Sequence, residues 1–294
     1  MTTKSLVQGV IADVITPFSA GGEVDLDALQ REIKLLDNSP VNGICVGGML
    51  SGLEGALPEE LASVCAAARR GSGKPLFAMV LPDTTMEGEE MIRAVEHAGA
   101  DAVLVAQPHY LSLPNKEGFL EMFADFRKVT RGPLLLADCF PNGMVGVAAT
   151  KVLVAKKLID GVFQSADIHV LVDLLYSSLG VPVYSGVEDM HYVALALGAR
   201  GAISDLATLF PGDMGELYRT FSEGKHEDAR SRHEKLVRLW RALGRYGESE
   251  ARARVALEAQ GRKVGSAPSP YNKLPAQAAG EVRSALQREG LARA

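Results

Sequence analysis

Cysteine and positive charge are both scarce in this sequence. Its 294 residues include three cysteines, Cys45, Cys65 and Cys139, which are too few and too scattered for a disulfide framework and form no CxxC pair. This cysteine usage is typical of proteins in the reducing cytoplasm. The 31 basic residues are outnumbered by 36 acidic ones, and the net charge of −5 gives no sign of the basic surface that nucleic-acid binding needs.

Long apolar segments and nucleotide motifs are also missing. No run of about 18 apolar residues occurs, so we expect no membrane span. The first residues carry no signal-peptide core or cleavage site, which again favours the cytoplasm. No GxGxxG opens a helix after an apolar run, and neither GxxxxGKS nor GxxxxGKT is present. A doubly wound nucleotide-binding sheet is therefore only the second choice of fold.

What the sequence does contain is a regular series of short apolar runs. Hydrophobic residues make up 47% and charged residues 23% of the chain, the composition of a globular protein with a large core. Most of the runs are continuously apolar, as expected of parallel strands that are covered on both faces. They lie at 10–15, 43–46, 76–81, 102–106, 134–137, 161–164, 183–185 and 201–204.

Segments with helical periodicity separate these runs. They lie at 25–36, 58–69, 87–98, 116–129, 148–157, 168–179, 187–197 and 212–222. Eight strand–helix units in succession predict an α/β protein, a (β/α)8 TIM barrel, in residues 1–223. Beyond it, three Arg- and Glu-rich helical segments and a Pro/Gly/Ser linker follow without any strand. Residues 224–294 are therefore predicted to form a C-terminal helical extension packed on the barrel.

Several short motifs occur in an order that is typical of one family. They are Thr16-Pro17-Phe18, Gly47-Gly48 followed by Glu54, Ala98-Gly99-Ala100-Asp101-Ala102, Pro108-His109-Tyr110, Ser185-Gly186-Val187-Glu188-Asp189 and Gly201-Ala202-Ile203-Ser204. On these motifs the chain resembles the dihydrodipicolinate synthase / N-acetylneuraminate lyase family from about Gly9 to its C-terminus. Each motif is weak alone, but their common order over nearly the whole chain supports the barrel fold.

The resemblance implies the chemistry of that family, whose members form or cleave carbon–carbon bonds next to a 2-oxo acid. In the family, a lysine on the sixth strand forms a Schiff base with the substrate, which becomes an electron sink. A tyrosine on the fifth strand moves the proton. A pair of threonine or serine residues after the second strand binds the substrate carboxylate through backbone N–H groups.

The reactive residues of the family are replaced in this sequence. Phe163 stands at the lysine position, and a slip of one residue puts Gln164 there; neither side chain has an amine. None of the 12 lysines lies at the C-terminal end of a predicted strand. Ala137 or Asp138 stands at the tyrosine position. The sequence therefore predicts a barrel that cannot form the family's Schiff base.

Two further sites in the sequence indicate which ligand the barrel would bind and whether it forms oligomers. Met49 and Leu50 stand where the family has its hydroxyl pair, and with Phe163 they predict an apolar floor that disfavours a bound 2-oxo carboxylate. Tyr110 matches the tyrosine that the family lends across a subunit interface, where a tyrosine buries apolar area and keeps its hydroxyl paired. We therefore predict a homodimer or homotetramer with Tyr110 and Leu111 in the contact.

Active sites of TIM barrels lie at the C-terminal ends of the strands. The polar residues predicted at these ends include Asp13, Thr16, Asp83, Gln107, Cys139, Ser165 and His191. We take Tyr110, Asp138 and His109 as the catalytic candidates, His109 because it titrates near neutral pH. The substrate-binding candidates are Gly48, Ser51, Gln164, Gly186, Ser204 and Asp205. Cys139 is interpreted as a structural thiol and His191 as a packed helix residue.

Acidic residues are frequent at the same strand ends. Asp138, Glu188, Asp189 and Asp205 form a set that would suit Mg²⁺ or Mn²⁺, and a metal would stabilise an enolate without an imine. Acidic residues at helix starts are also ordinary partners of the helix dipole. We favour the second interpretation and expect no metal and no other cofactor.

Three functions remain open from the sequence. The first is a diverged family member with lyase or aldolase-like chemistry on a 2-oxo acid, but without the Schiff base. The second is a catalytically inactive homologue that binds a ligand or regulates a partner. The third is a metal-assisted aldolase or hydratase. In each case the expected ligand is a small molecule, with no nucleic acid and no membrane as partner.

Overall fold

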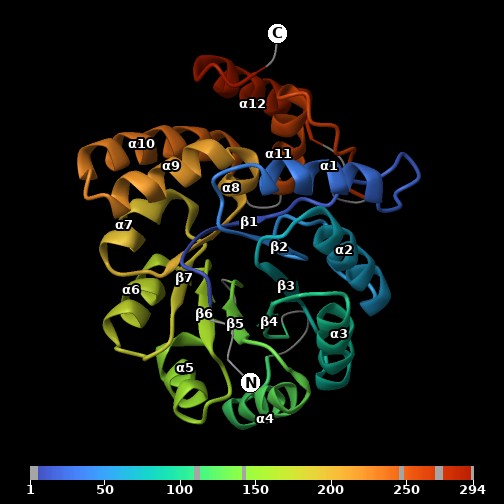
Figure 1. Cartoon of the computed structure of the whole chain (residues 1–294), viewed down its shortest axis with the longest axis vertical. Helices are drawn as coiled ribbons and strands as arrows, with labels where there is room; N and C mark the ends of the chain where they lie inside the picture. Colours follow the sequence, from blue (N-terminus) through green and yellow to red (C-terminus); the bar gives the residue numbers. More distant parts are fainter. Residues whose placement is uncertain (1–5, 109–112, 141–143, 245–247, 269–273, 293–294) are drawn as a thin grey trace.

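A closed barrel of parallel strands forms the centre of the molecule (Figure 1). The computed structural model describes residues 6–108, 113–140, 144–244, 248–268 and 274–292. Within this part of the chain eight strands pair in sequence order, and β1 closes the barrel on β8. They are β1 Gly9–Asp13, β2 Gly43–Val46, β3 Leu76–Val80, β4 Ala102–Ala106, β5 Leu134–Asp138, β6 Gly161–Gln164, β7 Val183–Ser185 and β8 Gly201–Ser204. The predicted TIM barrel is confirmed.

Helices connect the strands and surround the barrel. They are α1 Leu26–Asp37, α2 Pro58–Gly71, α3 Thr85–His97, α4 Lys116–Val129, α5 Gly146–Ala155, α6 Ile168–Tyr176, the 3-10 turn η1 Glu188–Met190, α7 His191–Ala196, α8 Asp205–Leu209 and α9 Pro211–Ser222. Their starts follow the local chemistry: the side chains of Asp25 and Asn115 accept hydrogen bonds from the backbone N–H groups of Ala28 and Gly118, both at 2.9 Å.

One short helix was not predicted from the sequence. The sequence predicted no element between residues 204 and 212, but α8 begins directly after β8. Ser204 caps it by accepting the N–H of Ala207 at 3.2 Å, and Asp205 lies in its first turn. Five residues are too few to show helical periodicity, whereas the Ser-Asp start is a signal that could have found it.

Strand alternation divides the barrel side chains into two sets. One set points inward and forms a compact apolar interior that includes Ile11, Ala137 and Phe163. The neighbouring residues point outward and pack against the helices. The registers place Phe163 between Ala137 of β5 and Tyr184 of β7. This alternation decides which residues at the strand ends face the barrel mouth.

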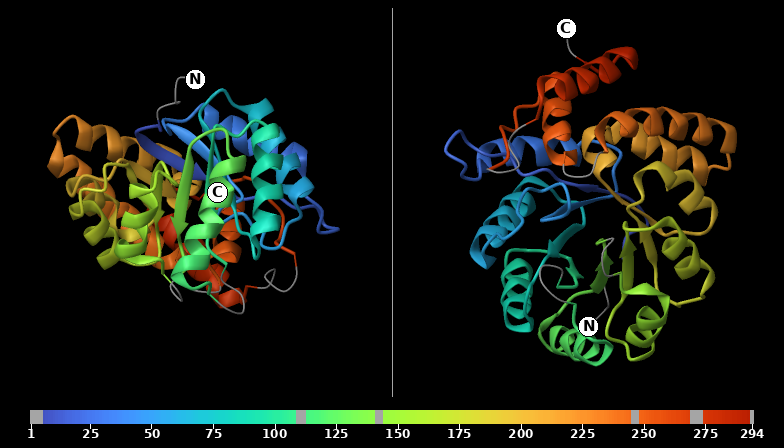
Figure 2. Two further views of the ribbon diagram at one scale, coloured as in Figure 1. Left: turned by 90° about the horizontal axis from the view of Figure 1, so that it is seen from below. Right: turned by 180° about the vertical axis from the view of Figure 1, so that it is seen from behind.

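The C-terminal helices α10 His226–Leu243, α11 Ser249–Ala259 and α12 Ala276–Arg288 lie together on one side of the barrel, beside α1 and α9 (Figure 2). Buried arginines join these C-terminal helices to the barrel. Arg262 donates to Glu32 of α1 at 3.0 Å and to the Thr208 carbonyl at 2.8 Å. Arg254 donates to the Thr16 carbonyl at 3.0 Å. None of the described helices is long and apolar enough to span a membrane.

Candidate functional site at the barrel mouth

Phe163 fills the barrel interior at the position that the resemblance assigns to the lysine. Its side chain is 3% exposed and belongs to the apolar interior. The ring packs closely on Gly186, where an added Cβ would lie 2.5 Å from ring carbons. Because Phe163 points inward, its neighbour Gln164 points outward, so a slip of one residue does not bring another side chain into the interior.

No lysine is among the buried side chains of the described residues. Lys74, for example, lies before β3, and its ammonium donates to the carbonyls of Ser39 and Val41 at 2.7 and 2.6 Å. Tyr184 is the tyrosine of the described interior, but its hydroxyl donates to the carbonyl of Val7, which precedes β1. It therefore points to the opposite end of the barrel from the mouth.

Two carboxyl groups meet at the mouth, at the ends of β1 and β8. Asp13 is the last residue of β1, is 2% exposed and points inward. Asp205, the first residue of α8, is partly exposed, and its carboxyl group lies within hydrogen-bonding reach of Asp13. Oδ2 of Asp13 accepts the Leu50 N–H at 3.4 Å, whereas Oδ1 is buried and finds no donor among the described groups. A proton shared with Asp205 would supply the donor that Oδ1 lacks and would relieve the repulsion between the two acids.

The electrostatics agree with a shared proton. Burial, with the nearby charge of Glu188, raises the pKa of Asp13 from 3.8 to about 7, although the backbone N–H of Leu50 opposes the shift. Burial and the charges of Glu188 and Asp13 also raise the pKa of Asp205 well above its ordinary value. The pair therefore retains a proton near neutral pH, where ordinary aspartates are fully ionised.

Glu188 is the centre of a buried hydrogen-bond network behind this pair. Its Oε2 accepts the Ser204 hydroxyl at 2.7 Å and the His191 ring nitrogen at 3.0 Å. Its Oε1 accepts the backbone N–H of Asp205 at 2.8 Å, and Oε2 also accepts that of Leu206 at 3.3 Å. Glu188 thus caps α8 rather than its own helix, and it fixes the backbone from which Asp205 extends. Ser204, a predicted substrate-binding residue, faces this network and not the interior.

Asp138 and Gln164, two of the predicted site residues, bind each other in the barrel wall. Asp138 is 1% exposed; its Oδ2 accepts the Gln164 amide at 2.8 Å and its Oδ1 accepts the Val145 N–H at 3.1 Å. Oε1 of Gln164 accepts the Ala166 N–H at 2.6 Å. Burial raises the pKa of Asp138. Both side chains alternate with the inward-facing Ala137 and Phe163, so they hold loops and do not face the mouth.

Gly48 and Ser51 form the loop after β2. The Ser51 hydroxyl donates to the Gly48 carbonyl at 2.6 Å, and the Ser51 N–H donates to the same oxygen at 3.1 Å. The resulting turn presses the Gly48 backbone against Asp13. The structure therefore brings Gly48, Gly186 and Asp205 to the inner rim of the mouth, while Ser51 shapes the loop. His109, Tyr110 and Leu111 lie outside the described residues.

The described residues at the mouth include neither a reactive thiol nor a group of metal-binding side chains. Cys139 is 4% exposed, and burial raises the pKa of its thiol, which disfavours the reactive thiolate. Across the described ranges, no group of three or more His, Cys, Asp or Glu side chains is arranged to hold a metal ion. The predicted set is split, because Asp138 binds Gln164 on β6 and Glu188 is engaged by four donors near β8.

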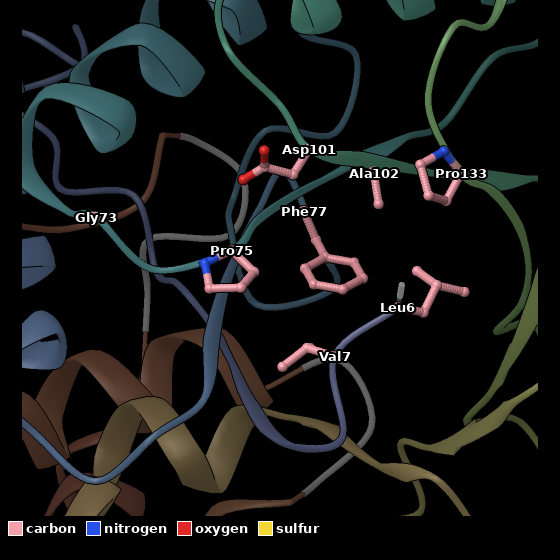
Figure 3. A pocket seen from close by; sticks show the side chains of 8 residues that line it. All are labelled: Leu6, Val7, Gly73, Pro75, Phe77, Asp101, Ala102 and Pro133. Atoms are coloured by element: carbon pink, nitrogen blue, oxygen red, sulfur yellow. The ribbon is translucent and has the colours of Figure 1, made fainter. Parts of the chain in front are cut away.

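A cavity of about 350 Å³ lies at the opposite, N-terminal end of the barrel (Figure 3). Leu6 and Val7 form one wall, with Phe77 facing them. The carboxylate in its lining, Asp101, already accepts Arg69 and the Leu76 N–H, both at 2.9 Å. Residues at this end of a TIM barrel serve stability, so we place the functional site at the mouth.

Comparison with known proteins agrees with this architecture. Residues 6–289 match the model of the dihydrodipicolinate synthetase family. The chain belongs to this family. It is 30% identical over 256 residues to a 4-hydroxy-tetrahydrodipicolinate synthase of Corynebacterium diphtheriae, a match that covers 86% of this chain and 84% of the relative.

Solved structures of the dihydrodipicolinate synthetase family have the same fold. The 4-hydroxy-tetrahydrodipicolinate synthase of Methylacidiphilum fumariolicum has a TM-score of 0.88 at 25% identity, covering 98% of this chain and 100% of that one. The dihydrodipicolinate synthase of Thermotoga maritima has a TM-score of 0.90 at 22% identity, with the same coverage. At 22% identity, the similarity to the Thermotoga maritima structure shows a shared fold alone.

The structure adds Asp13 to the predicted site. The sequence placed Asp13 at the end of the first strand, yet it was not among the candidate residues. The signal was present, because Asp13 is the one charged residue in the apolar run 10–15. A buried acid at the C-terminal end of a barrel strand is costly for folding, and such a residue is a functional candidate.

Proposed function

We propose that this chain is a member of the dihydrodipicolinate synthetase family that works without a Schiff base, through acid–base chemistry of the Asp13–Asp205 pair at the barrel mouth. The observation that carries the proposal is the contact of these two carboxyl groups, which retain a proton near neutral pH. The apolar ring of Phe163 in the interior supports the loss of the imine. The reaction class is addition to, or elimination from, a small carbonyl compound.

The two carboxyl groups have different roles in this proposal. Asp205 is partly exposed, so it is the member that exchanges a proton with a bound molecule. Asp13 is buried and acts through Asp205, as a positioning residue that keeps one proton in the pair. Glu188 holds the Asp205 backbone N–H at 2.8 Å and so fixes the geometry of the acid. General acid–base catalysis works best when the pKa lies near the working pH.

Incubation with pyruvate and borohydride is expected to leave the mass of the protein unchanged. Phe163 has no nucleophilic amine, and reduction traps an imine only where one has formed. Intact-protein mass spectrometry measures the outcome, with a lysine-dependent aldolase as the positive control. A stable pyruvate adduct on a lysine of this chain would contradict the proposal.

Asp205→Asn is expected to slow proton exchange at the carbon next to a substrate carbonyl by about 10²-fold. The assay follows loss of the ¹H NMR signal of dihydroxyacetone or glycolaldehyde in D₂O with the wild-type protein. Asp189→Asn is the matched control, because Asp189 is exposed at the neighbouring helix start. Equal exchange by the wild type and Asp205→Asn, or exchange no faster than in buffer, would favour the inactive homologue.

We also propose a homo-oligomer, either a dimer or a tetramer. Two exposed apolar side chains support it: Leu113 is 48% exposed, and Met86, at the start of α3, is 74% exposed. Association of subunits would remove such side chains from water.

A further inference from the structure

The backbone of the loop after β2 directs N–H groups toward the barrel interior. The two hydrogen bonds from Ser51 to the Gly48 carbonyl close the loop into a tight turn. The Leu50 N–H donates to Oδ2 of Asp13 at 3.4 Å, and the Met49 N–H also lowers the pKa of Asp13. Successive N–H groups in a turn make an anion-binding concavity. In this chain a side chain of the protein itself occupies that concavity.

Asp13 leaves little space for a second anion in this turn. A Cβ built on Gly48 would lie 2.0 Å from Oδ1 and 2.3 Å from Oδ2 of Asp13, so the carboxylate packs directly on the loop backbone. The Asp13 side chain is 2% exposed and cannot be displaced without moving β1 or the loop. An incoming carboxylate would have to expel a group that is built into the barrel.

The surrounding charges add to this exclusion. Glu188 and Asp205 are acidic groups close to Asp13: the charge of Glu188 raises the pKa of Asp13, and the Asp205 carboxyl group lies within hydrogen-bonding reach of it. The guanidinium of Arg254 approaches from behind the loop after β1, but it is bound to Glu250 and to the carbonyls of Thr16 and Val264. Among the described residues the other buried arginines are bound elsewhere: Arg252 donates to Glu248 at 2.8 Å and Arg262 to Glu32 at 3.0 Å. A negatively charged ligand would therefore meet acidic groups without a compensating cation.

We propose that Asp13 is a built-in carboxylate ligand of the loop after β2 and a specificity determinant, which excludes anions and selects an uncharged carbonyl or hydroxyl compound. The inference rests on the proposed function, in which the mouth is the reactive site. The occupied turn also gives a different reason from the sequence for the expectation that a 2-oxo acid binds poorly. A 2-oxo acid is disfavoured because the N–H groups are already occupied by Asp13, rather than because Met49 and Leu50 make the floor apolar.

Removal of the Asp13 carboxylate is expected to open the turn to pyruvate. At about pH 8, isothermal titration calorimetry should give no saturable pyruvate binding for the wild type. Asp13→Ala should bind at least about tenfold more tightly, the effect of hydrogen bonds to a charged group. Asp13→Asn keeps the volume of the side chain, so the turn should stay filled and pyruvate should not bind. Asp189→Asn removes an exposed charge and should match the wild type.

Three outcomes would overturn the inference: saturable pyruvate binding by the wild type, equal binding by Asp13→Asn and Asp13→Ala, or no gain in a folded Asp13→Ala protein. If Asp13→Ala does not fold, Asp13→Ser, which also empties most of this space, takes its place in the experiment. The binding result is independent of turnover. Asp205→Asn should still exclude pyruvate, so failure of the proton-exchange assay and failure of anion exclusion are distinguishable.

Discussion

Replacing Asp13 by asparagine is expected to raise the free energy of unfolding by about 4 kcal/mol at about pH 8 and to leave it nearly unchanged near pH 4. In the folded protein the pKa of Asp13 is raised from 3.8 to about 7. A raised pKa means that the folded state binds the proton more tightly than the unfolded chain does. The contribution of Asp13 to stability is therefore lost as the pH rises from about 4 to about 7, and this loss is constant above that range.

Asparagine avoids this loss because it does not titrate. Its amide oxygen can still accept the Leu50 N–H, and its NH₂ group can donate to Asp205, so the contacts of the protonated acid are preserved. Urea unfolding followed by circular dichroism at three pH values measures the difference. Asp189→Asn is the control for an exposed acid. A gain of the same size at every pH, or a loss at pH 8, would contradict the prediction.

Glu188→Ala is expected to lower the free energy of unfolding by about 3 kcal/mol at neutral pH. The Glu188 carboxylate is buried and accepts four hydrogen bonds, from Ser204, His191 and the N–H groups of Asp205 and Leu206. Its removal leaves these donors buried without an acceptor. Relief of the repulsion that raises the pKa of Asp13 and Asp205 offsets part of the cost.

Two matched variants separate the hydrogen bonds of Glu188 from its charge. Glu188→Gln keeps one acceptor oxygen and the volume of the side chain, so we expect a loss of about 1–2 kcal/mol. Asp189→Ala changes an exposed acid on the same turn and should stay within about 0.5 kcal/mol of the wild type. The midpoint of urea unfolding provides the measurement. If Glu188→Ala were as stable as Asp189→Ala, the network would contribute nothing to stability.

The sequence predicted the strands better than the site. Continuous apolar runs such as 43–46 and 102–106 match β2 and β4 residue by residue, because a strand buried on both faces cannot be polar without cost. The predicted site included Asp138 and Gln164, which bind each other in the barrel wall. The register decides their direction: Ala137 and Phe163 point inward, so their neighbours point outward.

The sequence by itself determined the barrel and the C-terminal helices, since these follow from the local apolar pattern, and residue identity alone carries the proposal that Phe163 stands in place of the family's lysine. Only the tertiary structure decided that Asp13 meets Asp205. The two residues are far apart in the chain, and they come together because β1 closes the barrel against β8. Barrel closure is a long-range pairing, and the proton shared between two distant side chains depends on it.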